Sequence, residues 1–96
     1  MSEAPKKSYE IVTSKKFDKD FEKAKKQQKD FSEFQKIIQF LEVGKALPVK
    51  YKDHKLKGDY KDYRECHIKP DWLLIYRYSD NDLILYRLGS HSELFQ

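Results

Sequence analysis

All three histidines of this chain fall in its second half, and each lies inside a short polar motif, at residues 51–54, 67–72 and 89–95. Histidine is the side chain best suited to moving protons at neutral pH. A single histidine is more often a half-buried polar residue than a catalyst, so the joint pattern carries the prediction. Three histidines among lysines, arginines and aromatics in a small basic domain indicate acid–base chemistry on a phosphodiester.

Cleaving RNA internally requires a base that takes the proton from a 2′-hydroxyl and an acid that protonates the departing 5′-oxygen. It also requires a cationic or hydrogen-bonding group that stabilises the crowded phosphorus centre. Histidine, aspartate and arginine supply all three functions. Because the attacking group is the 2′-hydroxyl, such an enzyme distinguishes RNA from DNA by chemistry and needs no metal. The sequence has no acidic cluster of the kind that would hold one.

A zinc site is the main chemical alternative, because His54, His67, His91 and Cys66 are good zinc ligands. Cys66 and His67 are neighbours in a segment that we expect to be extended, so their side chains leave opposite faces. No short paired spacing of cysteines or histidines is present either. We therefore predict neither a metal site nor a cofactor, and interpret Cys66 as a small buried residue.

Several cationic and aromatic side chains could serve either the substrate or the structure. Lys52 and Arg87 can hold a phosphate or solvate an edge, and Arg87 directly precedes the corner at residues 89–91. Aromatic side chains can stack unpaired bases, although in a small domain they more often fill the core. The candidates for stacking are Trp72, Tyr63, Tyr76 and Phe95. Trp72 is the best of these, because it lies beside a turn.

Length and charge bound the possibilities further. The 96 residues form one domain with one modest core. Twenty basic residues against sixteen acidic ones give a net charge of +4, which favours an anionic partner or serves solubility alone. Neither a signal peptide nor a long apolar span is apparent, and a single cysteine excludes an internal disulfide framework. We expect a cytoplasmic protein that does not associate with membranes.

The first half of the chain predicts a strand and two helices. After a flexible tail at residues 1–7, residues 9–13 have the composition of a strand. Ser14 can cap a first helix, and Asp30 with Glu33 matches a capping box for a second one that Gly44 ends. The apolar stripes of the two helices are Phe17, Phe21, Ala24 and Gln28, and then Phe34, Ile37, Ile38 and Leu41. Lysines cover the rest of the first helix, and by charge alone they favour an anionic partner such as nucleic acid.

The second half predicts a long basic loop at residues 45–61, which contains His54, and an antiparallel meander of strands at 63–69, 72–79 and 83–88. Pro70 and Asp71 suit a two-residue turn. On one face of the sheet, that turn pairs Lys69 with Trp72, His67 with Leu74 and Glu65 with Tyr76. It also places Arg64 opposite Arg77. The other face carries Cys66, Ile68, Leu73 and Ile75, and we expect it to be core. Ser90 and Glu93 match a second capping box, so His91 would open a final helical turn whose free amides suit a phosphate.

Three blocks of this sequence, residues 51–58, 63–76 and 87–95, resemble the YafQ branch of the RelE-type toxins, the toxin halves of bacterial type II toxin-antitoxin pairs. The resemblance is close over the second half of the chain, and the order of the predicted elements fits the whole. It implies an α+β, RelE-like fold in a single domain: an N-terminal strand, a two-helix hairpin and a three-stranded antiparallel meander, with the helices packed on one face of the sheet.

The resemblance also implies a function. Such a toxin is a ribosome-dependent, metal-independent mRNA endonuclease that cuts the codon in the ribosomal A site and leaves a 2′,3′-cyclic phosphate. It is neutralised by a cognate antitoxin, and operator DNA is a partner only of the toxin-antitoxin pair. The family's active-site positions fall on His54, His67, Asp71, Trp72, His91 and Phe95.

The resemblance suggests a role for each position. His91 would be the general acid and His67 or Asp71 the general base, although these labels can be exchanged. His54 would stabilise the phosphorane, and Trp72 with Phe95 would hold the bases. Two rivals stay open: a non-catalytic basic module that binds RNA or a protein, in which the histidines are structural, and a zinc-stabilised interaction domain.

Overall fold

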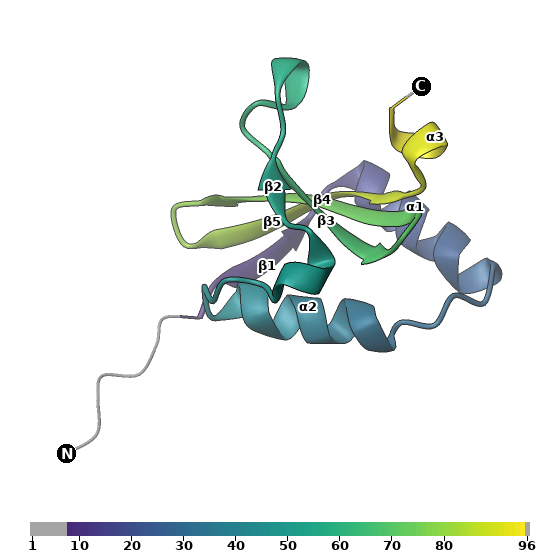
Figure 1. Ribbon diagram of the computed structural model, residues 1–96, viewed down its shortest axis with the longest axis horizontal. Helices are drawn as coiled ribbons and strands as arrows, with labels where there is room; N and C mark the ends of the chain where they lie inside the picture. The colour runs from purple at the N-terminus through teal and green to yellow at the C-terminus, as the bar shows by residue number, and fades with distance from the viewer. Residues whose placement is uncertain (1–7, 96) are drawn as a thin grey trace.

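The computed structural model describes residues 8–95, which form a five-stranded mixed sheet covered by helices (Figure 1). The predicted tail at residues 1–7 lies outside the described residues. The strand order is β1-β5-β4-β3-β2, with only β1 and β5 parallel. The bounds are β1 Glu10–Thr13, β2 His54–Lys55, β3 Arg64–Lys69, β4 Trp72–Ser79 and β5 Asp82–Gly89. The predicted α+β class, with its first strand and its meander, is confirmed.

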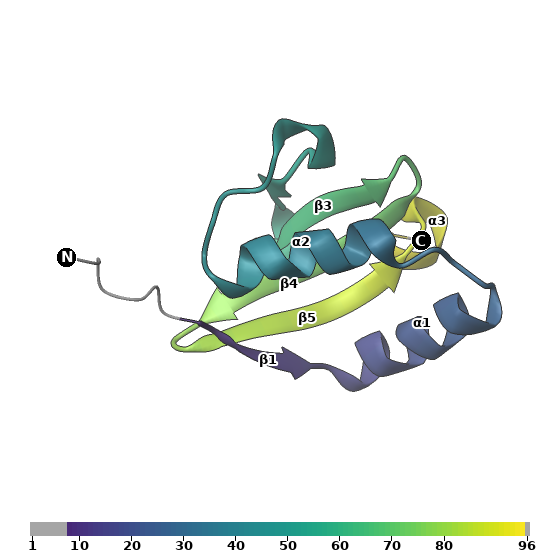
Figure 2. The same ribbon diagram turned by 90° about the horizontal axis from the view of Figure 1, so that it is seen from below.

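Helices α1 (Lys15–Lys26) and α2 (Ser32–Glu42) lie on one face of the sheet, as predicted (Figure 2). Their apolar stripes enter the main core, to which α1 contributes Phe17 and Ala24 and α2 contributes Phe34, Ile37 and Leu41. The short helix α3 (His91–Leu94) lies on the opposite face, where Leu94 packs on Leu73 and Ile75. Among the described helices, none has the length and apolar character needed to cross a membrane.

The helix ends follow local chemistry, with one exception. Ser14 caps α1, because its hydroxyl accepts a hydrogen bond from the Phe17 amide, and Gly44 ends α2 with a φ of +74°. The predicted capping box of Asp30 and Glu33 is wrong. Asp30 accepts from the Ser32 amide, which fixes the turn before α2, while the Glu33 carboxylate accepts from the Tyr51 hydroxyl instead.

The segment at residues 45–61, predicted as a loop, contains regular structure. It includes the 3-10 turns η1 (Val49–Tyr51) and η2 (Gly58–Tyr60) with β2 between them. Strand β2 pairs with β3, placing His54 opposite Glu65 and Lys55 opposite Arg64. A strand of two residues is too short to show alternation in the sequence, and only its pairing with β3 defines it.

The turn between β3 and β4 pairs Lys69 with Trp72 as predicted, but the register shifts by one residue between His67 and Lys69. His67 therefore faces Leu73 instead of Leu74, and Arg64 faces Tyr76 instead of Arg77. The bulge mixes the two predicted faces, because one residue of slip exchanges the sides of a strand. Trp72, Leu74 and Tyr76 join Cys66 and Ile68 in the helix-side core, whereas Leu73 and Ile75 belong to the smaller cluster on the other face.

Candidate active site

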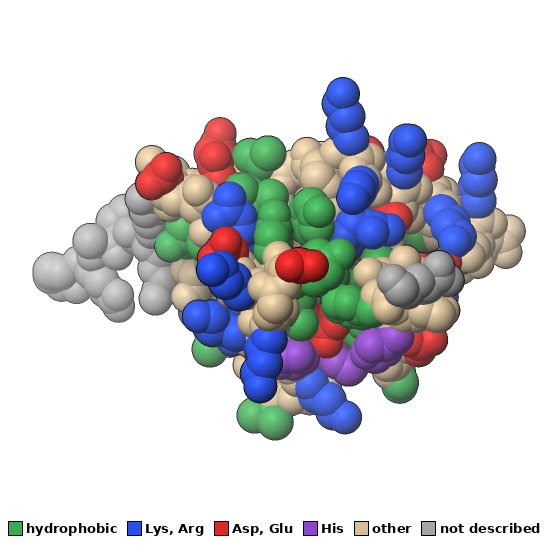
Figure 3. Space-filling model, turned by 90° about the horizontal axis from the view of Figure 1, so that it is seen from above, with side chains coloured by type: hydrophobic (Ala, Val, Ile, Leu, Met, Phe, Trp, Pro, Cys, Tyr) green, Lys and Arg blue, Asp and Glu red, His purple; other side chains and the backbone are tan. Residues whose placement is uncertain are grey.

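The fold brings the three histidines together in one row, although each comes from a different element. His54 lies on β2, His67 on β3 and His91 at the start of α3. The ring centroids of His54 and His67 are 6.4 Å apart, and those of His67 and His91 are 5.7 Å apart. Figure 3 shows the histidine side chains side by side on one surface. Three groups able to exchange protons are thus presented along a single line.

Glu65 joins two of these histidines and is absent from the residues predicted from the sequence. Its Oε1 lies 3.0 Å from His54 Nε2 and 3.4 Å from His67 Nε2, and its side chain is only 5% exposed. A buried carboxylate held between two imidazoles fixes the orientation of both rings. The sequence did offer one indication of this role: Glu65 lies two residues before His67, and alternate residues of a strand share a face.

Asp71 anchors His91, the third histidine. Its Oδ1 lies 3.1 Å from both the backbone nitrogen and the Nδ1 atom of His91. These hydrogen bonds, the backbone bond first, lower the pKa of the Asp71 carboxyl, because they favour its ionised form. The predicted capping box of Ser90 and Glu93 is present and starts α3 at His91. Asp71 and the cap together fix the His91 ring at the rim of the sheet.

Phe95 and Lys52 lie beside the histidines. Phe95 is 37% exposed, and its ring centroid is 6.3 Å from that of His91 and 5.7 Å from that of Tyr60. Lys52 is exposed, with a φ of +50°, two residues before His54. It lines a cavity of about 330 Å³ with His67 and the lysines at positions 50 and 69. This cavity has the charge that an RNA backbone requires.

Trp72 does not lie where a base could stack on it. It is 3% exposed and belongs to the main core, where its ring meets Phe31 edge-on with 5.5 Å between centroids. The prediction that its ring stacks a base is wrong for this structure. The register shift described above turns Trp72 toward the helices, where its ring packs on Phe31 and Phe34 and the Lys29 ammonium lies over it.

Arg87 forms an ion pair with a carboxylate that the sequence did not indicate. Its Nε and Nη2 atoms donate to the Asp20 carboxylate of α1 over 2.8 and 3.2 Å, and its side chain is 19% exposed. The hydrogen bonds to Asp20 raise the pKa of the guanidinium above its usual range. Arg87 thus ties β5 to α1, and its predicted contact with a phosphate is limited to the N–H groups that Asp20 leaves.

His54, Glu65 and His67 form a set with metal-binding geometry, because one ligand atom from each lies within 4.8 Å of the others. Two imidazoles and one carboxylate are a known donor set for zinc. Cys66 is apart from it, buried in the core on the opposite face, as the alternation along β3 predicted. The set was missed because Glu65 was not considered as a ligand and His54 was placed in a loop.

A family model described as "Bacterial toxin of type II toxin-antitoxin system, YafQ" matches residues 9–96. The mRNA interferase toxin YafQ of Escherichia coli strain K12 is 39% identical over 88 residues, which cover 90% of this chain and 95% of that protein. The structure is similar to the toxin in the E. coli DinJ-YafQ toxin-antitoxin complex, with a TM-score of 0.85 at 38% identity, over 93% of this chain and 99% of that one.

A crystal structure of a metal-bound toxin from Helicobacter pylori is 52% identical, with a TM-score of 0.85, over 91% of this chain and 99% of that chain. The match to the family model and the identity to the curated E. coli toxin both extend over nearly the whole chain. This protein therefore belongs to the YafQ family of toxins from bacterial type II toxin-antitoxin systems.

Proposed function

We propose that this toxin is an endoribonuclease that enters the ribosomal A site and cuts the mRNA codon there, which stops translation. The observation that carries this proposal is the row of three histidines with Asp71 at one end and Glu65 within it. A curated relative named an mRNA interferase supports the same activity.

The chemistry that we propose is attack of the 2′-hydroxyl on the adjacent phosphate, without a metal. His67 or Asp71 takes the proton from the 2′-hydroxyl, His91 protonates the departing 5′-oxygen, and His54 stabilises the charge on phosphorus. The first two labels can be exchanged. Lys52 and the exposed N–H groups of Arg87 are candidate phosphate contacts, and Phe95 stacks on a base. Glu65 acts through the two histidines that it orients.

We also propose the partners. The DinJ-YafQ complex supports a cognate antitoxin for this chain, and operator DNA would be bound only by the toxin-antitoxin pair. Because cleavage of mRNA on ribosomes takes place in the cytoplasm, we propose that the toxin acts there. The +4 charge of the chain fits both RNA and an acidic antitoxin segment.

The test is mRNA cleavage in a purified translation system, with and without ribosomes, comparing the wild-type chain with His91→Ala and mapping the cut ends by primer extension. We expect ribosome-dependent cuts within codons that disappear in the variant. Equal cleavage by both proteins would remove His91 from the mechanism. Absence of cleavage by a folded wild-type chain would favour the rival reading of a non-catalytic RNA-binding or protein-binding module.

A second function is favoured by one specific observation, the donor set of His54, Glu65 and His67. We propose that it binds a transition metal of the zinc or copper type, and the metal-bound toxin from H. pylori supports this. Because the metal would occupy two of the three histidines, bound metal would inhibit the nuclease.

Calorimetric titration with Zn²⁺ should show one site that Glu65→Ala weakens. Cleavage should rise when a chelator is added, and a chelator that unfolds the protein would instead show a structural metal.

A further inference from the structure

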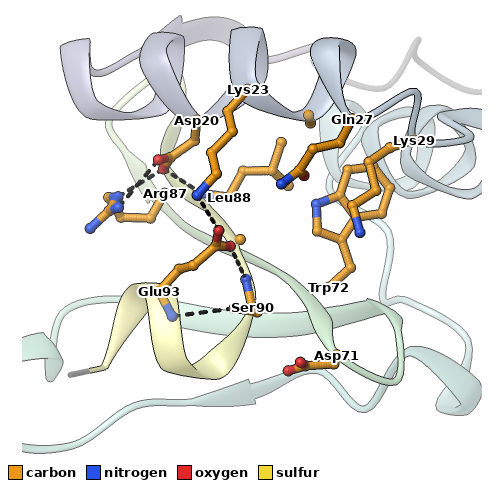
Figure 4. A pocket seen from close by; sticks show the side chains of 12 residues that line it. Asp20, Lys23, Gln27, Lys29, Asp71, Trp72, Arg87, Leu88, Ser90 and Glu93 are labelled. Carbon is orange, nitrogen blue, oxygen red and sulfur yellow. Dashed lines mark hydrogen bonds and ion pairs between the residues drawn. The ribbon is translucent and has the colours of Figure 1, made fainter.

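A cavity of about 600 Å³ lies beside the catalytic row, on the helix side of the sheet edge. It is bounded by the second half of α1, the beginning of β4, the end of β5 and the start of α3 (Figure 4). Asp71 belongs to both sites, since it anchors His91 and also lines this cavity. The opening is therefore adjacent to the histidines, and it is large enough for one nucleotide of a strand bound there.

The indole N–H of Trp72 is a polar group without a partner at the wall of this cavity. Trp72 is 3% exposed, and within the described residues no hydrogen bond involves its indole nitrogen. No fully buried side-chain nitrogen or oxygen among those residues lacks a partner, so the indole nitrogen must reach the cavity surface. Figure 4 shows it on the side of the ring that faces Gln27. A buried donor of this kind requires an acceptor from a ligand or water.

The other lining groups define what the cavity accepts. Arg87 is paired with Asp20, and Lys23 is paired with Glu93, so four of the charged groups neutralise one another. Lys29 forms no ion pair within the described residues, and its Nζ lies 5.6 Å from the centroid of the Trp72 ring. The exposed Gln27 side chain offers an amide donor and acceptor at the same wall. An indole donor, an amide and one available cation suit a base edge with acceptors and its phosphate.

We propose that this cavity holds one nucleotide of the substrate RNA next to the cut, and that Trp72 and Gln27 determine which base is accepted. The inference rests on the nuclease activity proposed above and adds the residues that select its substrate. Trp72 acts through its N–H edge, because its ring packs on Phe31 and Phe34 and is covered by Lys29. Lys29 neutralises the phosphate of the same nucleotide.

The first experiment compares cleavage at reporter codons that carry each of the four bases at each position, on ribosomes. Trp72→Phe removes the N–H and keeps an aromatic ring in the core, and Gln27→Met removes the amide at constant length. Each variant should reduce the preference between bases at one position by about fivefold, the effect of losing one hydrogen bond. Gln35→Met on the exposed side of α2 is the matched control and should keep the wild-type preference.

If the wild-type chain cuts and both variants keep its base preference, the cavity inference is overturned while the nuclease proposal stands. Gln27→Met keeps the test valid if Trp72→Phe does not fold, because the Gln27 side chain is exposed. If the wild-type chain does not cut, the nuclease proposal fails, and a binding measurement decides the inference.

That measurement uses the single tryptophan, which gives one indole N–H resonance in the NMR spectrum. Titration with a 2′-O-methyl trinucleotide, which cannot be cleaved, should shift this resonance with saturation, and about fivefold more ligand should be needed for Gln27→Met. The Gln35→Met protein should titrate like the wild type. An indole signal that does not move would overturn the site, whether or not the histidine signals shift.

Discussion

At the scale of single residues, Glu65 is the side chain that turns two neighbouring histidines into an ordered pair. Its carboxylate oxygen contacts both His54 and His67, and the side chain is almost fully buried. A carboxylate accepts hydrogen bonds only, so it can serve two ring nitrogens at once. The orientation of both imidazoles therefore depends on this one residue.

Glu65→Gln should lower the rate of cleavage while the protein stays folded. The amide keeps the shape of the side chain and one oxygen acceptor, but it removes the negative charge. Both rings contact the same oxygen, Oε1, and a neutral oxygen holds them less strongly than a carboxylate, so both rings are less well oriented. A small misplacement of a catalytic group costs on the order of tenfold to a hundredfold in rate. The rate is measured with saturating protein on programmed ribosomes, and circular dichroism verifies the fold. Glu10→Gln, at an exposed position of β1, is the control, and an unchanged rate in Glu65→Gln would show that Glu65 only supports the structure.

Cys66 is a residue of the core, and its chemistry should reflect this. Burial, with smaller contributions from Asp53 and Glu65, raises the pKa of the Cys66 thiol well above its usual range. Since the thiolate is the reactive form, a neutral alkylating reagent should modify the native protein at least about tenfold more slowly than the protein in urea. The rates are followed by mass spectrometry. Equally fast modification of both states would contradict the burial of Cys66 in the core.

At the scale of elements, α3 is a helix of four residues that carries His91 and depends on its cap. Ser90 accepts from the Glu93 amide, and Glu93 accepts from the Ser90 amide. Gly89 makes this closure possible, because a Cβ there would lie 2.9 Å from Glu93 Oε1 and 3.2 Å from Leu94 Cδ2. The position of the proposed acid thus depends on Gly89, Ser90 and Glu93.

Ser90→Ala should therefore reduce activity more than stability. Loss of a capping side chain costs about 1 kcal/mol, and the free energy of unfolding, measured with urea, should fall by that amount or less because α3 is short. Cleavage on ribosomes should fall more steeply, since His91 is released from its place above Asp71. Ser92→Ala, in the same turn, is the control, because it removes the 3.3 Å contact of the Ser92 hydroxyl with Ser90 Oγ and leaves both hydrogen bonds of the capping box. Equal losses in the two variants would show that the cap does not position His91.

The contact between Glu33 of α2 and Tyr51 of η1 links two elements and should be visible as a pH effect. The Tyr51 hydroxyl, with further help from Lys36, lowers the pKa of Glu33 from 4.5 to about 2. The ionised form is therefore favoured in the folded state. Its stabilising effect is fully present above pH 4.5 and is lost as the pH falls toward 2.

Glu33→Gln should accordingly be less stable than the wild type at pH 6, and the difference should disappear toward pH 2. The measurement is urea unfolding at a series of pH values. Tyr51→Phe, which removes the donor, should lose stability over the same pH range. A difference that is constant with pH would mean that the Glu33 charge contributes nothing.

At the scale of the whole molecule, the row of histidines lies with α3 on one side of the sheet, and the lysine-rich helix α1 lies on the other side. The lysines at positions 16, 19 and 26 of α1 are exposed, and the net charge is +4. Contacts between lysines and phosphates release counterions, so they make binding dependent on salt. We therefore propose that α1 contacts ribosomal RNA.

Replacing Lys16, Lys19 and Lys26 together with Gln should weaken ribosome binding and make it less sensitive to salt. Each lost phosphate contact lowers the slope of log K against log salt by about 0.7 to 0.9. Binding is measured by sedimentation in a His91→Ala background, which we expect not to cleave. The control replaces the exposed lysines at positions 36, 45 and 57, which lie on other elements. Equal slopes in the two triple variants would show that charge, and not the α1 surface, governs binding.

The sequence alone determined the features that depend on near neighbours. The caps at Ser14 and Ser90, the helix end at Gly44 and the turn after Lys69 all form as predicted, because each is made by contacts within a few residues. The residues of the histidine motifs were also evident from type and spacing. The match to the family model extends over nearly the whole chain, not over these motifs alone.

Only the tertiary structure decided how these residues face one another. Because of the bulge before Lys69, Trp72 points into the core. Strand β2 is defined only by its pairing with β3. Asp20 of α1 pairs with Arg87 of β5. The placement of Glu65 between two histidines follows from the same pairing. Each depends on contacts between distant segments, where a slip of one residue exchanges the two faces of a strand, and local periodicity carries no information about that slip.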